Sequence, residues 1–291
     1  MRRRLQPRLS EPGVFVNQHN PFHRIRSRER HHANAPVLEV NHLNLRYGNR
    51  LILEDITFTL ERGQRIAVVG PNGAGKSTLF KVIAGVIPPS SGNVTVYGEG
   101  PVGHICIAYV PQRSQVDWHF PVNIYDVVMM GRVGVLGFAR MPGTRDHQLV
   151  RHCLSTVGLS DLANRQISEL SGGQQQRMFI ARALAQQAEI ILMDEPLNGL
   201  GIPSQEAIFG ILGTLQAQQV TVMVATHDLH QAAEKFDRVM LLKRNLLGFG
   251  EAAQVLTPEI LKQTYGGHFH IIPTQEGLMA LGDSCCDQDE V

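Results

Sequence analysis

Gly70-Pro71-Asn72-Gly73-Ala74-Gly75-Lys76-Ser77-Thr78 is the stretch that decides the fold of this chain. It matches the pattern G-x-x-x-x-G-K-[ST], in which backbone amides wrap phosphate groups and the lysine reaches the outer phosphates. It lies between an apolar run at 65–69, which predicts a strand, and an apolar-periodic stretch at about 76–84, which predicts a helix. The N-terminus of that helix adds partial positive charge to the loop. The sequence therefore predicts a nucleotide phosphate-binding loop, with Ser77 as a ligand of Mg²⁺.

A second motif follows further along the chain. Ile190-Ile191-Leu192-Met193-Asp194-Glu195 is an apolar run that ends in two carboxylates. We expect Asp194 to hold the metal-bound water network and Glu195 to polarise the attacking water. A strand that ends in two acids is common by itself. Beside a phosphate-binding loop, however, this pair completes the site of a nucleoside triphosphatase.

The rest of the chain alternates between expected strands and expected helices, which favours βαβ units and a mostly parallel sheet. Strands are expected at 37–46, 51–60, 65–69, 94–97, 105–110, 189–193, 220–225 and 238–242. Helices are expected at 76–84, 172–186 and 205–215, and across 120–165 with breaks at 131–137 and 141–143. The predicted fold class is α/β: a P-loop NTPase core of mostly parallel sheet flanked by helices, with an antiparallel β subdomain and an inserted helical subdomain at about 113–172.

Composition limits the other possibilities. The 291 residues carry a formal net charge of +1, but the Arg-rich segment 1–36 alone carries +6 and the remainder about −5, so a basic body that grips nucleic acid is not expected. The apolar runs fall short of the roughly 20 residues that a transmembrane helix needs. We expect 1–36 to be a disordered basic extension, with an early start codon or an organelle transit peptide as alternatives. The ATPase domain is then expected at 37–265, followed by a tail at 266–291.

Among nucleoside triphosphatases, the choice depends on Leu170-Ser171-Gly172-Gly173-Gln174. This segment resembles the signature motif of ATP-binding-cassette (ABC) proteins, and it precedes the acidic strand, as it does in that family. Ser171 and the two glycine amides would open the helix that follows and offer a site for a γ-phosphate. The resemblance covers about residues 37–265 and implies ATP and Mg²⁺ as cofactors.

Three further residues fall where the resemblance places functional side chains. Gln112, after the strand at 105–110, matches the glutamine that senses Mg²⁺ and water and meets the membrane subunit. His227, after the strand at 220–225, matches the histidine that bonds the γ-phosphate and orients Glu195. Tyr47 matches an aromatic residue that stacks on adenine. The catalytic set implied is therefore Glu195, His227 and Gln112.

The resemblance also implies an assembly. Two cassettes of this family sandwich two ATP molecules, so that Ser171 and Gly173 of one chain face the nucleotide held by Lys76 of the other. We therefore expect a dimer of this chain, bound to integral membrane permease subunits at the cytoplasmic face of the membrane. A substrate-binding protein would be an indirect partner.

One position departs from the family pattern. Asn198-Gly199-Leu200-Gly201 carries a glycine where the family usually has an aspartate that communicates across the dimer. Lys76, Asp194, Glu195 and His227 are unaffected, so we expect an active but slower ATPase. A regulatory cassette that binds ATP and hydrolyses it poorly is the alternative.

The transported substrate is suggested by Val116-Asp117-Trp118-His119-Phe120-Pro121-Val122 and by Asp126-Val127-Val128-Met129-Met130-Gly131-Arg132. Both segments resemble the manganese, zinc and iron-chelate uptake branch of the family, in which this region receives the membrane subunit; a subdomain core is the plainer interpretation. Manganese or zinc is the expected substrate, and an iron chelate, another substrate or a soluble non-transport cassette remain alternatives. A metal-sensing tail built on His268, His270, Cys285 and Cys286 is a further, weaker hypothesis.

Overall fold

The computed structural model describes residues 35–100, 106–137, 140–266, 269–274 and 277–282. Most of the predicted basic extension therefore lies outside the described residues. His268, Cys285 and Cys286 also lie outside them, so the hypothesis of a metal-sensing tail stays untested.

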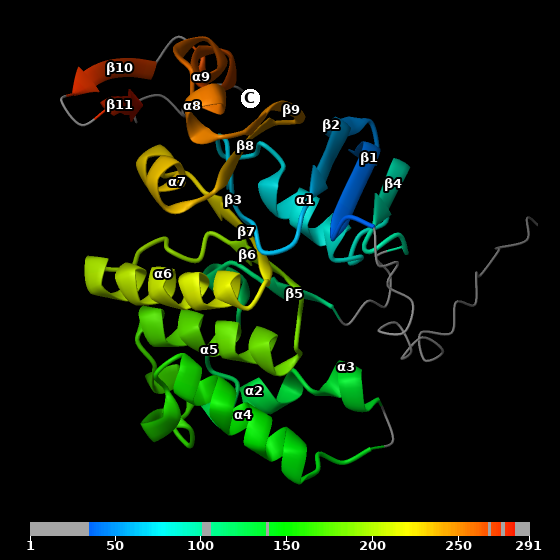
Figure 1. Ribbon diagram of the computed structural model, residues 1–291, viewed down its shortest axis with the longest axis vertical. Helices are drawn as coiled ribbons and strands as arrows, with labels where there is room; N and C mark the ends of the chain where they lie inside the picture. Colours follow the sequence, from blue (N-terminus) through cyan, green and yellow to red (C-terminus); the bar gives the residue numbers. More distant parts are fainter. Residues whose placement is uncertain (1–34, 101–105, 138–139, 267–268, 275–276, 283–291) are drawn as a thin grey trace, which may run out of the picture.

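A six-stranded sheet forms the centre of the molecule (Figure 1). Its strand order is β5-β6-β7-β3-β8-β9, and every neighbouring pair is parallel except β8 and β9. The strands are β3 (Arg65–Val69), β5 (Ile107–Val110), β6 (Ile190–Asp194), β7 (Thr221–Thr226), β8 (Arg238–Lys243) and β9 (Asn245–Gly250). Parallel strands place their carboxyl ends at one edge, so β3, β6 and β7 bring their following loops together there.

The sheet is buried on both faces, as its nearly continuous apolar strands require. In β3, Ala67 and Val69 belong to one hydrophobic cluster, and Ile66 and Val68 belong to the other. The first cluster is completed by the helices α4 (Thr144–Thr156), α5 (Gly172–Ala185) and α6 (Ile202–Ala217). The second is completed by α1 (Lys76–Ile83) and by an antiparallel sheet.

That antiparallel sheet has the order β2-β1-β4, with β1 (Leu38–Tyr47), β2 (Arg50–Leu60) and β4 (Ser91–Thr95). A tight turn at Gly48, which has a φ of +56°, joins β1 to β2. The predicted antiparallel subdomain and the predicted α/β core are thus both confirmed.

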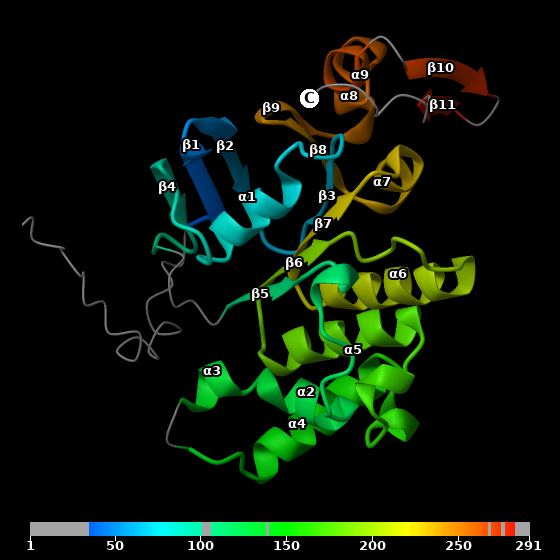
Figure 2. The same cartoon turned by 180° about the vertical axis from the view of Figure 1, so that it is seen from behind.

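Helices α2 (Ile124–Met130), α4 and α5 pack together at the end of the molecule opposite the antiparallel sheet (Figure 2). The short helix α3 (Val133–Leu136) and the 3₁₀ turns η2 (Arg113–Gln115), η3 (Ser160–Leu162) and η4 (Ile167–Glu169) belong to the same region. The break that the sequence predicts at 131–137 therefore contains one turn of helix. Gly131, directly after α2, has no room for a side chain, because a Cβ there would lie 2.3 Å from the carbonyl oxygen of Arg182.

The chain after β9 is more structured than the sequence indicates. After β9, helices α8 (Ala252–Val255) and α9 (Pro258–Tyr265) cover one end of the sheet. Earlier in the chain, helix α7 (Leu229–Lys235) connects β7 to β8. Strands β10 (Phe269–Thr274) and β11 (Gly277–Gly282) then form an antiparallel hairpin within the segment expected to be a tail.

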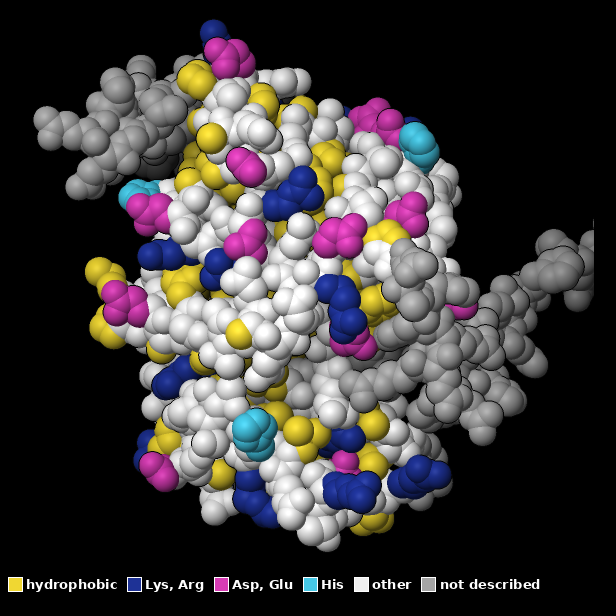
Figure 3. All heavy atoms as spheres, viewed as in Figure 1, with side chains coloured by type: hydrophobic (Ala, Val, Ile, Leu, Met, Phe, Trp, Pro, Cys, Tyr) yellow, Lys and Arg dark blue, Asp and Glu magenta, His cyan; other side chains and the backbone are white. Residues whose placement is uncertain are grey.

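Among the described residues, the helices are all too short or too polar to cross a membrane. Acidic and basic side chains are interspersed over the face shown in Figure 3.

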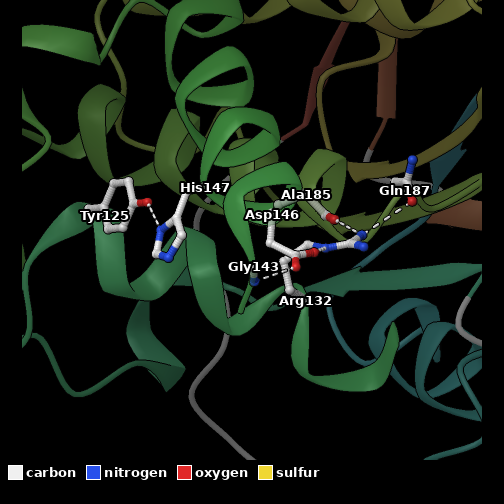
Figure 4. Close-up of polar contacts among 7 residues, drawn as sticks. All are labelled: Tyr125, Arg132, Gly143, Asp146, His147, Ala185 and Gln187. Carbon is white, nitrogen blue, oxygen red and sulfur yellow. Dashed lines mark hydrogen bonds and ion pairs between the residues drawn. The ribbon is translucent and has the colours of Figure 1, made fainter. Parts of the chain in front are cut away.

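A buried ion pair holds the helical region together (Figure 4). Arg132 Nε donates to Asp146 Oδ1 at 2.9 Å, and Arg132 Nη1 donates to the carbonyl oxygen of Ala185, at the end of α5, at 2.8 Å. Asp146 also accepts from the N–H of Gly143, which begins α4. One guanidinium therefore ties the start of α3 to the start of α4 and the end of α5.

Candidate functional site

The loop that is predicted to bind phosphate lies between β3 and α1, where the sequence places it. Gly70 has a φ of +159°, and a Cβ there would lie 2.0 Å from the carbonyl oxygen of Leu242. Gly75 has a φ of +100°, and a Cβ there would lie 2.7 Å from Leu53 Cδ2. Gly70 therefore requires glycine because a Cβ would collide with the backbone of β8, and Gly75 requires it because of its positive φ.

Lys76 is buried inside this loop. Its Nζ donates to the carbonyl oxygen of Gly70 at 2.7 Å and to that of Pro71 at 3.2 Å. Burial lowers the pKa of Lys76, while the charges of Glu195 and Asp194 oppose that decrease. The ammonium group is thus held at the loop with two carboxylates nearby.

Asp194 ends β6 and is 2% exposed. Burial raises its pKa, the hydrogen bond with Ser77 opposes the rise, and the charge of Glu195 adds to it. Tyr109, on the neighbouring strand β5, donates from its hydroxyl to Asp194 Oδ2 at 3.3 Å. Ser77 and Asp194 thus place side by side two oxygen-bearing side chains that could hold a metal ion.

Glu195 follows Asp194 with its backbone in the left-handed region, at a φ of +48°. This conformation costs a non-glycine residue about 1–2 kcal/mol. The carboxylate of Glu195 has different hydrogen-bond partners from that of Asp194. Its Oε2 accepts hydrogen bonds from Gln112 Nε2 at 3.1 Å and from Asn198 Nδ2 at 3.2 Å. Gln112, in the loop after β5, therefore contacts the carboxylate that follows β6, a contact that the sequence analysis did not predict.

His227 follows β7 and lines a cavity of about 120 Å³ that Glu195 and Asn198 also line. Its neighbour Asp228 begins α7 and accepts a hydrogen bond from the N–H of Gln231 at 2.9 Å. The histidine is thus presented at the end of a buried strand, on the same cavity as the acid that it is predicted to orient.

The signature segment begins α5. Ser171 and Gln174 form a capping box, in which the N–H of Ser171 donates to Gln174 Oε1 at 2.9 Å. A Cβ on Gly172 would lie 2.8 Å from Arg113 Nη1, and one on Gly173 would lie 2.6 Å from Ser204 Oγ. These glycines therefore allow two neighbouring segments to approach the start of α5 closely.

The structure brings together Lys76, Ser77, Asp194, Glu195 and Gln112 through the contacts above, with His227 on the shared cavity. Tyr47 lies apart from them, at the end of β1 in the antiparallel sheet, with 51% of its side chain exposed. The signature residues lie at the start of α5, beside Arg113 and Ser204.

Sequence reasoning did not single out Tyr109, Arg113 or the bond from Asn198 to Glu195. Asn198 lies three residues after Glu195, which is the spacing of a turn, so its contact could have been anticipated. The Tyr109 contact depends on β5 lying beside β6, which the order of strands along the chain does not reveal.

A glycine-rich loop of the P-loop pattern and two carboxylates at the edge of a mostly parallel sheet, with a helical insertion, are typical of the P-loop nucleoside triphosphatase class. The model of the family described as ABC transporter matches residues 53–198. The manganese transport system ATP-binding protein MntB of Bacillus subtilis is 44% identical over 231 residues, which cover 79% of this chain and 92% of that protein. The zinc transport system ATP-binding protein TroB of Treponema pallidum is 44% identical over 237 residues, which cover 81% and 89%.

Among solved structures, an ABC transporter of the metal-chelate type in an inward-facing conformation is similar, with a TM-score of 0.72 and 30% identity. The match covers 84% of this chain and 96% of that one. This chain belongs to the ABC transporter family, and its place there is that of the subunit that binds and hydrolyses ATP.

Proposed function

We propose that this chain hydrolyses ATP to drive the import of a transition-metal ion, manganese or zinc. The observation that carries the proposal is the 44% identity, over about four fifths of the chain, to subunits named for manganese transport and for zinc transport. The solved transporter of the metal-chelate type, at 30% identity, supports the same branch.

In the proposed site, the amides from Gly70 to Thr78 and the ammonium group of Lys76 hold the phosphates of ATP. Mg²⁺ prefers oxygen ligands in near-octahedral geometry, and the adjacent oxygens of Ser77 and Asp194 suit it, with Gln112 close by. When bound, the ion would neutralise charge on the phosphates. Tyr47, half-exposed at the end of β1, is proposed to stack on the adenine ring.

Glu195 is the proposed general base. Its carboxylate holds two amide donors, Gln112 and Asn198, on one oxygen, Oε2. The carboxylate can therefore be oriented without being protonated, and it can polarise a water molecule toward the terminal phosphate. His227, on the cavity that Glu195 also lines, is proposed to bond the γ-phosphate and to orient the acid.

We further propose that two copies of this chain sandwich two ATP molecules. The capped N-terminus of α5, with Ser171, Gly172, Gly173 and Gln174, would then face the phosphates held by the partner copy. Integral membrane permease subunits would bind the dimer at the cytoplasmic face of the membrane, and a substrate-binding protein would act through them. Exposed Phe120 and Met130, which lie within the two segments that resemble the metal-uptake branch, offer an apolar surface for such a contact.

The experiment is uptake of radioactive manganese and zinc by cells that lack this gene and are complemented with variants. Lys76→Ala should abolish the uptake of one metal, and Lys81→Ala, in the same helix, should leave it at the wild-type level. Unchanged uptake of both metals with Lys76→Ala would overturn the metal assignment. It would direct attention to iron chelates, since the chelated iron transport protein YfeB of Yersinia pestis is 42% identical.

A further inference from the structure

Two loops hold the same oxygen of Glu195. Gln112, in the loop after β5, donates to Glu195 Oε2 at 3.1 Å. Asn198, in the loop after β6, donates to the same atom at 3.2 Å. Any change at this carboxylate, such as the arrival of a nucleotide and its water, must therefore disturb one or both loops.

Both loops continue to Gly172 in the signature segment. Arg113 directly follows Gln112, and a Cβ on Gly172 would lie 2.8 Å from its Nη1 atom. Leu200 follows Asn198 by two residues, and the same Cβ would lie 3.0 Å from its Cδ2 atom. The two partners of Glu195 are thus linked, through their own loops, to one glycine at the start of α5.

The Arg113 link is polar and attached at several points. Its Nε donates to Gln175 Oε1, on α5, at 2.6 Å. Its carbonyl oxygen accepts from Trp118 Nε1 at 3.0 Å, and the Trp118 ring packs against Phe179 of α5 with centroids 5.6 Å apart. Arg113 is therefore fixed to the first half of α5 by its side chain and by its backbone.

The Leu200 link is apolar at Gly172. Gln205 of α6 holds this loop, because its Nε2 donates to the carbonyl oxygen of Leu200 at 2.9 Å. The next residue, Gly201, has no side chain to add a polar contact. Of these two links between the Glu195 loops and the start of α5, the link through Arg113 therefore contains a hydrogen bond to α5, and the link through Leu200 is an apolar contact.

We propose that Arg113 is a positioning residue that transmits the state of Glu195 to the signature end of α5. When the hydrogen bond between Gln112 and Glu195 rearranges, the adjacent Arg113 shifts against Gly172 and Gln175 and reorients the helix N-terminus. This inference rests on the proposed function, because the N-terminus of α5 would act on the nucleotide held by the partner copy. Arg113 would thus connect the two ATP sites of the dimer.

The test compares purified full-length variants. The Arg113 side chain is exposed, so Arg113→Ala should fold and bind ATP as the wild type does, with a Tm lowered by a few degrees because buried Gln175 loses its donor. Its kcat should fall about tenfold, the effect of losing one hydrogen bond made by a charged group, while KM changes little. The Hill coefficient for ATP should fall toward 1. Arg165→Ala, which removes another exposed arginine of the helical region, should change none of these values.

A second variant separates positioning from loss of charge. Gln175→Ala should reproduce the effects on kcat and cooperativity, and the Arg113→Ala/Gln175→Ala double variant should be no worse than either single variant. Additive losses, or wild-type kcat and cooperativity in Arg113→Ala, would overturn the proposal. If the wild-type chain binds Mg-ATP but neither dimerises nor hydrolyses it, the proposed function itself fails, and the coupling fails with it.

Discussion

Replacing Arg132 with methionine removes the positive charge from a network in which Arg132 is buried and Asp146 is partly buried. The side chains of Arg132 and Asp146 are 8% and 13% exposed, so water cannot readily replace the lost guanidinium. Methionine replaces the aliphatic stem of arginine and lacks the guanidinium group, so the variant tests chiefly the loss of charge and hydrogen bonding. Asp146 would keep the N–H of Gly143 as a donor, and the carbonyl oxygen of Ala185 would lose Arg132 Nη1.

The expected cost is large for a single substitution. Breaking a buried ion pair and leaving one charge uncompensated costs about 3–5 kcal/mol of unfolding free energy. In a protein of this size that corresponds to a decrease in Tm of about 10 °C. Arg132→Met/Asp146→Asn, which removes the uncompensated charge as well, should recover about 1–2 kcal/mol.

The effect should depend on pH in a defined direction. The hydrogen bond from Gly143 and that from Arg132 hold the pKa of Asp146 below its ordinary value. A lowered folded-state pKa contributes stability that is present above the unfolded pKa, about 3.9, and is lost as pH falls through the folded pKa. The difference in unfolding free energy between wild type and Arg132→Met should therefore be largest at neutral pH and should become smaller below about pH 4.

The assay is urea unfolding followed by circular dichroism at several pH values, with Arg145→Ala as the control. Arg145 is exposed in the first turn of α4, the helix that also contains Asp146. Its removal should therefore change the unfolding free energy by less than about 0.5 kcal/mol. A loss below about 1 kcal/mol for Arg132→Met, or an equal loss at pH 7 and pH 3, would refute the reasoning.

Three further predictions concern the nucleotide site. Gly70→Ala should abolish ATP binding, measured by calorimetry, because its Cβ would lie 2.0 Å from the carbonyl oxygen of Leu242; binding within about threefold of wild type would contradict this. Asp194→Asn should raise the Tm of the nucleotide-free protein while abolishing hydrolysis, because burial raises the pKa of Asp194 and its charge therefore opposes folding at neutral pH; a lower Tm would contradict it. Gly201→Asp should leave Tm nearly unchanged, since the nearest atom to an added Cβ is 3.9 Å away. The variant should nevertheless strengthen ATP-induced dimerisation about fivefold or more. Unchanged dimerisation, measured by light scattering, would show that the missing carboxylate has no effect.

The core of the fold could be predicted because its signals are local. The loop at Gly70 is fixed by glycine positions, and the start of α5 is fixed by the capping box of Ser171 and Gln174. Strand β9 was not predicted, because Gly248 and Gly250 interrupt its apolar pattern and its pairing with β8 supplies the stability instead. Helix α7 is short and depends on the Asp228 cap, which is a weak signal in sequence.

In the candidate site, too, some residues could be predicted from the sequence and some contacts could not. Lys76, Asp194 and Glu195 follow strands with recognisable endings, so their meeting could be predicted from parallel topology. The contacts of Tyr109 and Arg113 depend on which strand or helix lies beside them. That information comes from packing between segments far apart in the chain, and no spacing within the sequence carries it.

The most direct test of the account is steady-state hydrolysis of Mg-ATP by the purified chain, with Glu195→Gln beside wild type. Glutamine keeps the shape of the side chain and an acceptor for Gln112, but it removes the base. The account predicts that the wild-type protein hydrolyses ATP and that Glu195→Gln hydrolyses it about 10²–10⁴-fold more slowly. The variant should bind ATP as tightly as the wild type does. Equal turnover in the two proteins would contradict the assignment of Glu195 as the residue that activates water.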